Sequence, residues 1–416
     1  MAFEQLKFES FLTTAAVLIL TGLLFFIWNK NRRLPPGPWG LPFIGYYPHI
    51  SNQPYKDLYK LSKKYGNVIS FRTLGGNLVI VLNGTKTIKE IFVNRADEFI
   101  GRPHGNNLVI WVSEGLGIAQ EEGAPWKEQR RFFLHNLKNF GVGKAQIETL
   151  VIDEIQIMLQ DLRKTDGKPI ELLPHLAYLA HSVISEVLFS QKFEKNDPKW
   201  LAIRQATHSM AEVFAGNKFL LVGWAFELYM AISPKTREVT KARDFIWKTT
   251  NTFIEEHIRS FDPSNVGDYI DVYLYKRNEL LKSGKLNETS FSMERLQGNC
   301  LNIFFEGIES VSIAATGLLT ELSKHLDVQR KVQKEMDNIV GRDRLPSWTD
   351  RQNLPYLDAT MYELYRVASP FLISTQLSNF EETTIEGYRI PRRSSIIANF
   401  WTLNIDPVIY PEPEKF

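Results

Sequence analysis

Hydrophobic positions open the chain as one unbroken block. Residues 11–28, FLTTAAVLILTGLLFFIW, carry no charge and are long enough to cross most of a bilayer core as a helix. Charged residues of both signs precede the block, and Lys30, Arg32 and Arg33 follow it. A cleaved signal peptide has different flanks, and basic residues after a span favour a cytoplasmic body. We therefore predict an uncleaved single-pass anchor at 1–28, with membrane lipid as a partner.

A second long apolar stretch, residues 296–326, contains no proline and is predicted to form one helix that crosses the whole domain. Its middle contains only two charges, Glu306 and Glu309, set around Gly307. Residues three apart lie near each other on a helix, and an interior glycine weakens a helix by about 1 kcal/mol. Two interpretations stay open. Either a ligand approaches this face closely, or the two acids of a core helix point into a water-filled notch.

Helical and strand patterns alternate in the rest of the chain. Apolar and charged positions at helical spacing between residues 146 and 262 predict several packed helices. Val68–Arg72 and Leu78–Leu82 are predicted strands joined by a glycine turn, and residues 383–400 are predicted to form a short hairpin sheet. The basic and proline-rich connector at 29–45 is expected to be stiff and to set the tilt of the body on the membrane.

Composition narrows the class of protein. A chain of 416 residues with 44% hydrophobic content can bury a large core. The 49 Lys and Arg residues against 47 Asp and Glu give no basic excess, so we expect no nucleic-acid partner. The single cysteine, Cys300, excludes a disulfide framework and indicates a reducing compartment.

The segment WKEQRRFF begins at Trp126 and is predicted to be helical. Helical spacing sets Trp126 and Arg130 on one face, with Lys127 and Arg131 about a hundred degrees further round. An indole donor one turn from a guanidinium suits an anionic group at the edge of a planar ligand. The alternative is an amphipathic helix whose arginines lie on the surface.

Another helix is predicted in LPYLDATMYELYRVASP, residues 354–370. Glu363 and Arg366 lie three apart in this mostly apolar segment, which favours a buried, mutually hydrogen-bonded pair. The alternative is a surface ion pair that contributes less than about 1 kcal/mol to stability.

The order of these motifs carries a family resemblance. The apolar block, LPPGPWGLPFIG, FIGRP at 99–103, WKEQRRF, the glycine and acid of the long helix, LPYLDATMYELYR and GYRIP together resemble a microsomal cytochrome P-450. The similarity is to the animal drug- and fatty-acid-oxidising branch. It implies a mainly α, triangular domain over 46–416 with a small β lobe, held at the endoplasmic reticulum membrane.

The resemblance also implies a function and a cofactor. The family consists of haem-thiolate monooxygenases, which insert one oxygen atom of O2 into apolar small organic substrates with electrons from a flavoprotein reductase. By position, Trp126 and Arg130 would hold the haem propionates, and Gly307 would line the oxygen pocket. Glu309 and Ser310 would pass protons during oxygen activation, with Ser310 where the family usually has threonine. Glu363 and Arg366 would brace the core, and Lys127 and Arg131 would dock the reductase.

Several positions depart from the family pattern. The family's haem-ligating cysteine lies in a glycine-rich loop after the region that resembles PEPEKF, where this chain ends, so we expect a fold incomplete at the C-terminus. Cys300 lies on the long helix and is predicted to be a buried structural thiol, which leaves no residue as axial ligand to the metal. Glu306 stands where a small residue is usual, and its proximity to Glu309 should raise at least one of the two pKa values.

Two further departures concern the rim of the site. The family's propionate-binding His or Arg is replaced by Leu377 and Ser378, and its histidine before Asp406 is replaced by Asn404. Three hypotheses follow: a monooxygenase, a membrane-anchored relic that at most binds apolar ligands, and a metal site on Glu306 and Glu309. The third is the weakest, because the Glu-x-x-His motifs of di-iron bundles are not found.

Overall fold

The computed structural model describes residues 32–103, 105–139, 145–214 and 216–416. The predicted membrane anchor at 1–28 lies outside the described residues, and the division into anchor, connector and body stays a prediction. Two described helices, Leu172–Phe189 and Met293–Lys324, are long and apolar enough to cross a membrane, but both pack in the interior of the protein.

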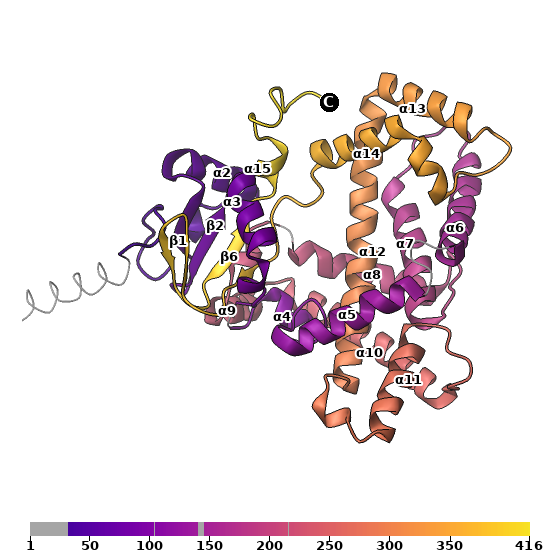
Figure 1. Cartoon of the computed structure of the whole chain (residues 1–416), viewed down its shortest axis with the longest axis horizontal. Helices are drawn as coiled ribbons and strands as arrows, with labels where there is room; N and C mark the ends of the chain where they lie inside the picture. Colours follow the sequence, from indigo (N-terminus) through magenta and orange to yellow (C-terminus); the bar gives the residue numbers. More distant parts are fainter. Residues whose placement is uncertain (1–31, 104, 140–144, 215) are drawn as a thin grey trace, which may run out of the picture.

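Helices form most of the molecule (Figure 1), which confirms the predicted mainly α fold with a small β lobe. Their bounds are α2 Pro54–Tyr65, α3 Thr85–Lys89, α4 Leu108–Ser113, α5 Gly123–Asn139, α6 Ala145–Arg163, α7 Leu172–Phe189, α8 Pro198–Phe214, α9 Trp224–Ile232, α10 Thr236–Ser260, α11 Tyr269–Lys282, α12 Met293–Lys324, α13 Leu326–Ile339, α14 Pro355–Ala368 and α15 Trp401–Asn404.

The β lobe lies on the left in Figure 1, beside the helical part. Its strands are β1 Val68–Arg72, β2 Leu78–Leu82, β3 Leu377–Ser378, β4 Thr383–Ile385, β5 Tyr388–Ile390 and β6 Ser395–Ala398. The antiparallel β1–β2 hairpin is confirmed, and Gly75 and Gly76 supply the positive φ values of its turn.

The prediction of one hairpin sheet over 383–400 is wrong for its last strand. Only β4 and β5 form the hairpin, whereas β6 pairs in parallel with β2 and completes a sheet of order β1-β2-β6-β3. All four residues of β6 are buried, as expected for a central strand covered on both faces. Burial of Ile396 and Ile397 therefore favours a central position for β6 in the sheet. The residues around β6 in the sequence do not indicate that β2 is its partner strand.

The long helix α12 is confirmed as a single element. It begins after Ser292, whose side chain accepts a hydrogen bond from the backbone N–H of Arg295, and it ends at Lys324. It packs most extensively on α7, and its buried positions include Leu296, Phe304 and Ile308. In Figure 1 it spans the full height of the helical part.

Close contacts join the start of α12 to α5 and to the segment before α5. The Asn299 amide donates to Gln129 Oε1 on α5 at 2.9 Å, and both residues are buried. A Cβ atom on Gly298 would lie 2.7 Å from the Cβ atom of Leu116, so only glycine allows this approach. The basic segment at the start of α5 is thereby held beside the long helix.

Candidate functional site

Trp126 and Arg130 lie one turn apart on α5, as the helical spacing predicts. The Arg130 guanidinium carbon lies 5.5 Å from the centre of the Trp126 ring. The Arg130 side chain is exposed and forms no ion pair with any residue that the structure describes. The Trp126 indole N–H donates to the carbonyl of Ile118 at 2.9 Å, so an anionic ligand would have to replace that acceptor.

Arg102 is a third member of this group, and the sequence did not single it out. Its guanidinium donates to the carbonyls of Ala119 at 3.0 Å and Ile100 at 2.9 Å and lies 6.0 Å from the Trp126 ring. Burial lowers the pKa of Arg102, Glu122 and Glu306 oppose this, and the charge of Arg130 lowers it further. The FIGRP motif at residues 99–103 is the signal in the sequence that marks this position.

Glu306 lies on the side of α12 that is close to Arg102. Part of its side-chain surface is accessible to solvent. The surrounding protein nevertheless desolvates the carboxylate and raises the pKa of Glu306 to about 7, against the opposing charge of Arg102. The predicted cause, a like charge on Glu309, was wrong, because burial raises this pKa.

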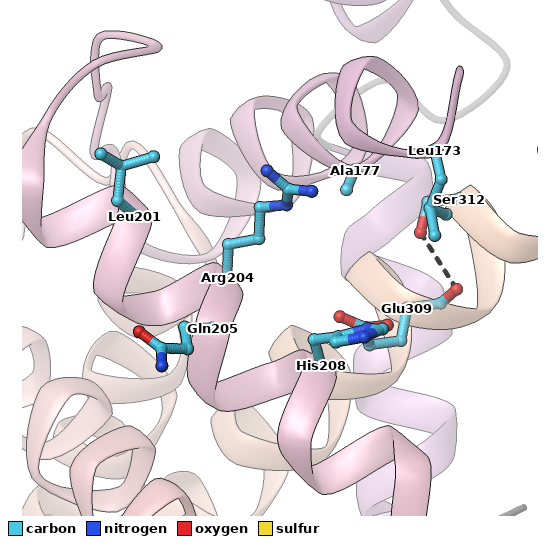
Figure 2. Close-up of a pocket in the computed structure, with 8 residues that line it drawn as sticks. All are labelled: Leu173, Ala177, Leu201, Arg204, Gln205, His208, Glu309 and Ser312. Atoms are coloured by element: carbon cyan, nitrogen blue, oxygen red, sulfur yellow. Dashed lines mark hydrogen bonds between the residues drawn. The ribbon is translucent and has the colours of Figure 1, made fainter. Parts of the chain in front are cut away.

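Glu309 points to a different side of α12. It is 8% exposed and lines a cavity of about 200 Å³ between α7, α8 and α12, in which Arg204 and His208 come from α8 (Figure 2). Among the described residues, no side chain donates a hydrogen bond to its carboxylate. Glu306 and Glu309 therefore do not face one ligand together, and a metal site shared by both carboxylates is ruled out by this geometry.

Gly307 and Ser310 both have contacts within the helical part of the protein. A Cβ atom on Gly307 would lie 3.2 Å from Cγ1 of Ile184, so Gly307 faces α7 and permits close helix packing. That Gly307 lines an oxygen pocket stays a prediction. The Ser310 hydroxyl donates to the carbonyl of Glu306 at 2.6 Å and is only partly buried.

Glu363 and Arg366 form a two-pronged ion pair on α14, with N–O distances of 2.8 and 2.6 Å. The Arg366 side chain is 6% exposed, and it also donates to the carbonyls of Asn404, Pro413 and Lys415. This guanidinium is saturated with protein acceptors. It therefore connects α14 to the C-terminal segment and offers nothing to a ligand.

Cys300 lies on α12 in the interior of the protein. Its side chain is 0% exposed, and burial raises the pKa of the thiol well above its ordinary value. A thiol of this kind is inert toward metals. It is the single cysteine of the printed sequence.

Ser378, which stands where a basic rim residue was expected, lies next to Arg102. Its hydroxyl donates to the Arg102 carbonyl at 2.9 Å, and its backbone pairs with Gly101. The Asn404 amide donates to the Ser369 hydroxyl at 2.9 Å. Ser378 and Asn404 thus both form hydrogen bonds within the protein.

The structure has a helical body with a small mixed sheet and a long central helix, and sequence comparison identifies its family. The family model for Cytochrome P450 matches residues 35–416, so the chain belongs to the cytochrome P450 family, whose members are haem-dependent monooxygenases.

Individual relatives support this assignment. The chain is 34% identical over 415 residues to Cytochrome P450 2C44 of Mus musculus, which covers 96% of this chain and 81% of that protein. It is 30% identical over 419 residues to Cytochrome P450 2A4 of Mus musculus, with 97% and 82% covered. It is also 30% identical over 414 residues to Cytochrome P450 18a1 of Drosophila melanogaster, with 98% and 76% covered.

The described residues fit the anionic edge of haem but not its axial position. Arg102 and Arg130 form no ion pairs with described residues, so two cations share one indole. Two propionates would relieve the repulsion between them through charge-assisted hydrogen bonds. Cys300 is enclosed, so no thiol among the described residues could reach a haem iron.

Proposed function

We propose that the protein is a membrane-associated haem monooxygenase that oxidises an apolar small organic molecule, and that Arg102, Arg130 and Trp126 hold its haem propionates. The observation that supports this most is the pair of guanidinium groups beside one indole, neither of which forms an ion pair with a residue that the structure describes. When bound, haem supplies the iron that activates dioxygen. Electrons would come from a flavoprotein reductase, for which exposed Arg131 and Lys127 offer a basic surface.

Glu309 and Ser310 would supply protons to this reaction. The Glu309 carboxylate lies in a cavity that His208 and Arg204 also line, and Ser310 is the next residue along α12. A carboxylate can take up a proton on the α8 side of the helix and release it toward the hydroxyl on its neighbour.

Binding of porphyrin tests the proposed cluster. We expect the purified chain to bind haemin and protoporphyrin IX, and Arg102→Ala to weaken both. Protoporphyrin IX retains the propionates but has no iron, so its binding does not depend on an axial ligand. If the chain binds neither compound, the proposed function is wrong.

A second function is favoured by the burial of Cys300. Without an axial thiolate, the protein would bind haem or apolar ligands but would not cleave the O–O bond efficiently. Reduction of the haem complex under carbon monoxide separates the two functions. A thiolate-type spectrum would support the monooxygenase, and its absence would support the non-oxidising binding protein.

Membrane association beyond the predicted anchor is supported by exposed apolar residues at one edge of the β lobe. These residues lie on two segments, and Gly75 contacts both. Its N–H donates to the Phe43 carbonyl at 3.1 Å, and a Cβ atom on Gly75 would lie 3.0 Å from the Trp224 indole nitrogen. The exposed side chains are Trp39, Leu41, Phe43, Trp224, Leu228 and Ile232. This edge would lie in the surface of the endoplasmic reticulum membrane.

Lipid contact at this edge can be measured with a fluorescent label. Cys300 is buried and should not react, so Ile232→Cys gives one labelling site, and Leu281→Cys on α11 gives an exposed control, with relative exposures of 70% and 57%. We expect quenchers attached to lipid to quench the label at 232 and not the label at 281. Equal quenching at both positions would contradict the proposed orientation.

A further inference from the structure

The segment between α4 and α5 lies closely against α12. Gly117 in this segment has φ +87°, in the left-handed region that favours glycine, and a Cβ atom on it would collide with the Asn302 side chain and the Gly298 carbonyl. Asn302 is 5% exposed and lies one helical turn before Glu306, on the same face of α12. The first half of the long helix therefore presents a buried amide to this segment.

Asn302 contacts one peptide group of the segment, the one between Ile118 and Ala119. The side-chain oxygen Oδ1 of Asn302 accepts the backbone N–H of Ala119 at 3.1 Å. The carbonyl of the same peptide group, which belongs to Ile118, accepts the Trp126 indole N–H at 2.9 Å. The next carbonyl, that of Ala119, accepts Arg102 Nε at 3.0 Å. Two consecutive carbonyls thus hold two of the three side chains that we propose bind the propionates.

The planar Ile118–Ala119 peptide group transmits the direction that Asn302 sets. Its N–H and C=O point in opposite directions and cannot turn independently, because the peptide bond does not rotate freely. An N–H fixed on Asn302 therefore fixes the Ile118 carbonyl and, with it, the place where the indole donates. The Ala119 carbonyl is separated from this peptide group by only two rotatable bonds, so its direction is restricted as well.

We propose that Asn302 is a positioning residue, which orients the Ile118–Ala119 peptide group and thereby holds Trp126 and Arg102 in place before an anionic ligand binds. A ligand that meets ordered side chains does not have to immobilise them, and its affinity is higher for that reason. When a propionate binds, it takes over the indole N–H, while the Ala119 carbonyl continues to hold Arg102. This inference rests on the proposed function, because it takes the propionate edge of a porphyrin as the ligand.

Removal of the Asn302 acceptor tests this role. Asn302→Leu keeps a side chain of similar shape but cannot accept the Ala119 N–H. We expect this variant to bind protoporphyrin IX about tenfold more weakly than the natural chain, because binding then has to order two side chains. Porphyrin fluorescence at fixed salt measures the affinity. Equal or tighter binding by Asn302→Leu would overturn the proposal.

Thr316→Val is the matched control for this substitution. It removes another side-chain hydrogen bond of α12, from the Thr316 hydroxyl to the Ser312 carbonyl at 2.7 Å, and this bond lies within the helix itself. The change in shape is small, and no contact with the segment before α5 is lost. We therefore expect Thr316→Val to bind protoporphyrin IX as tightly as the natural chain.

A double-mutant cycle separates positioning from a general loss of stability. Trp126→Phe keeps an aromatic ring but removes the N–H that the Ile118 carbonyl accepts. In this background, Asn302→Leu should weaken binding only about threefold, since Arg102 is then the one side chain left to be positioned. A purely structural role for Asn302 predicts the same loss in both backgrounds, and that result would overturn the proposal.

The Trp126 indole N–H gives a readout that needs no porphyrin. The sequence contains nine tryptophans, and Trp126→Phe identifies the signal of Trp126 in nuclear magnetic resonance spectra of the indole groups. We expect this N–H to exchange faster with water in Asn302→Leu than in the natural chain. Asn302→Asp, which keeps an acceptor oxygen at the same position, should retain slow exchange.

The outcomes of this measurement keep the two proposals apart. If the natural chain binds no porphyrin, the proposed function fails, and exchange of the Trp126 indole N–H still decides whether Asn302 positions Trp126. Unchanged exchange in Asn302→Leu would overturn the positioning role, even where porphyrin binds to the natural chain.

Discussion

Arg366 and Arg130 lie on different helices and use their guanidinium groups in opposite ways. Arg366 is 6% exposed and donates to Glu363 and to the carbonyls of Asn404, Pro413 and Lys415. Arg130 is exposed and has no ion pair among the residues the structure describes, although it lies over the Trp126 ring and near Arg102.

The difference separates a structural arginine from the arginine that we propose binds a ligand. A buried guanidinium costs free energy unless its donors are satisfied. The role of Arg366 is therefore to stabilise the fold. A guanidinium held close to a second cation without a carboxylate is unfavourable in the free protein and gains from an anionic ligand. The degree to which the guanidinium donors are satisfied by protein acceptors, rather than the residue type, thus distinguishes Arg366 from Arg130, which we propose binds a cofactor.

The largest expected effect is the loss of the Glu363 carboxylate. Glu363→Ala leaves the buried Arg366 charge without its carboxylate, and we expect the free energy of unfolding to fall by about 3 to 5 kcal/mol. Urea titration followed by circular dichroism measures the change. Asp337→Ala, which breaks an exposed pair with Arg342, should leave stability within error. Equal effects of the two substitutions would remove the distinction drawn for Arg366.

A third ionic site sharpens the comparison because its cation titrates. Burial lowers the pKa of His257, but the hydrogen bond to Asp268 at 2.7 Å, the charge of Asp268 and the Phe253 carbonyl together raise it to about 9. A raised histidine pKa stabilises the fold fully below pH 6.5, and this stabilisation is lost as the pH rises through 9.

We expect this pair to contribute about 3 kcal/mol that disappears between pH 6.5 and pH 9. The free energy of unfolding of the natural chain should therefore fall across this interval, whereas His257→Gln should start lower and remain nearly flat. Chemical unfolding at half-unit pH steps measures both curves. Parallel curves for the two proteins would show that His257 does not gain a proton on folding.

Substitution of Arg130 tests the binding side of the comparison. Arg130→Ala should weaken protoporphyrin IX binding about 10- to 100-fold, because one charge-assisted hydrogen bond is worth about 1.5 to 3 kcal/mol. Its free energy of unfolding should barely change, since the side chain is exposed. Arg131→Ala, the exposed neighbour, should retain full affinity. If Arg131→Ala is the weaker binder, α5 presents its other face to the ligand.

The smallest expected effect concerns Glu306. Burial raises the pKa of Glu306 to about 7, so the carboxyl group is neutral below this pH and repels an anionic ligand above it. Porphyrin affinity should fall modestly as the pH rises from 6 to 8, and Glu306→Gln should remove this dependence. Stability follows the same sign, since a raised carboxyl pKa favours the folded state at low pH. A pH profile unchanged in Glu306→Gln would place the side chain away from the ligand.

Local signals in the sequence determined most elements of the fold. The apolar pattern and the Ser292 cap determine α12, and the Gly75–Gly76 turn determines the β1–β2 hairpin, because each depends on residues close together in the chain. The spacing of Trp126 and Arg130 was predictable for the same reason, since a helix places residues four apart on one face.

Contacts between distant segments decided the rest. Parallel pairing of β6 with β2, packing of Gly307 against Ile184, and the direction of Glu309 toward α8 depend on which elements lie next to each other. Arg102 joins the cluster because Glu122 binds its backbone, and Arg393 reaches Glu122 from 271 residues away. The sequence alone thus determined which helices and strands form, and the tertiary structure decided which charges form ion pairs within the described part of the protein and which do not.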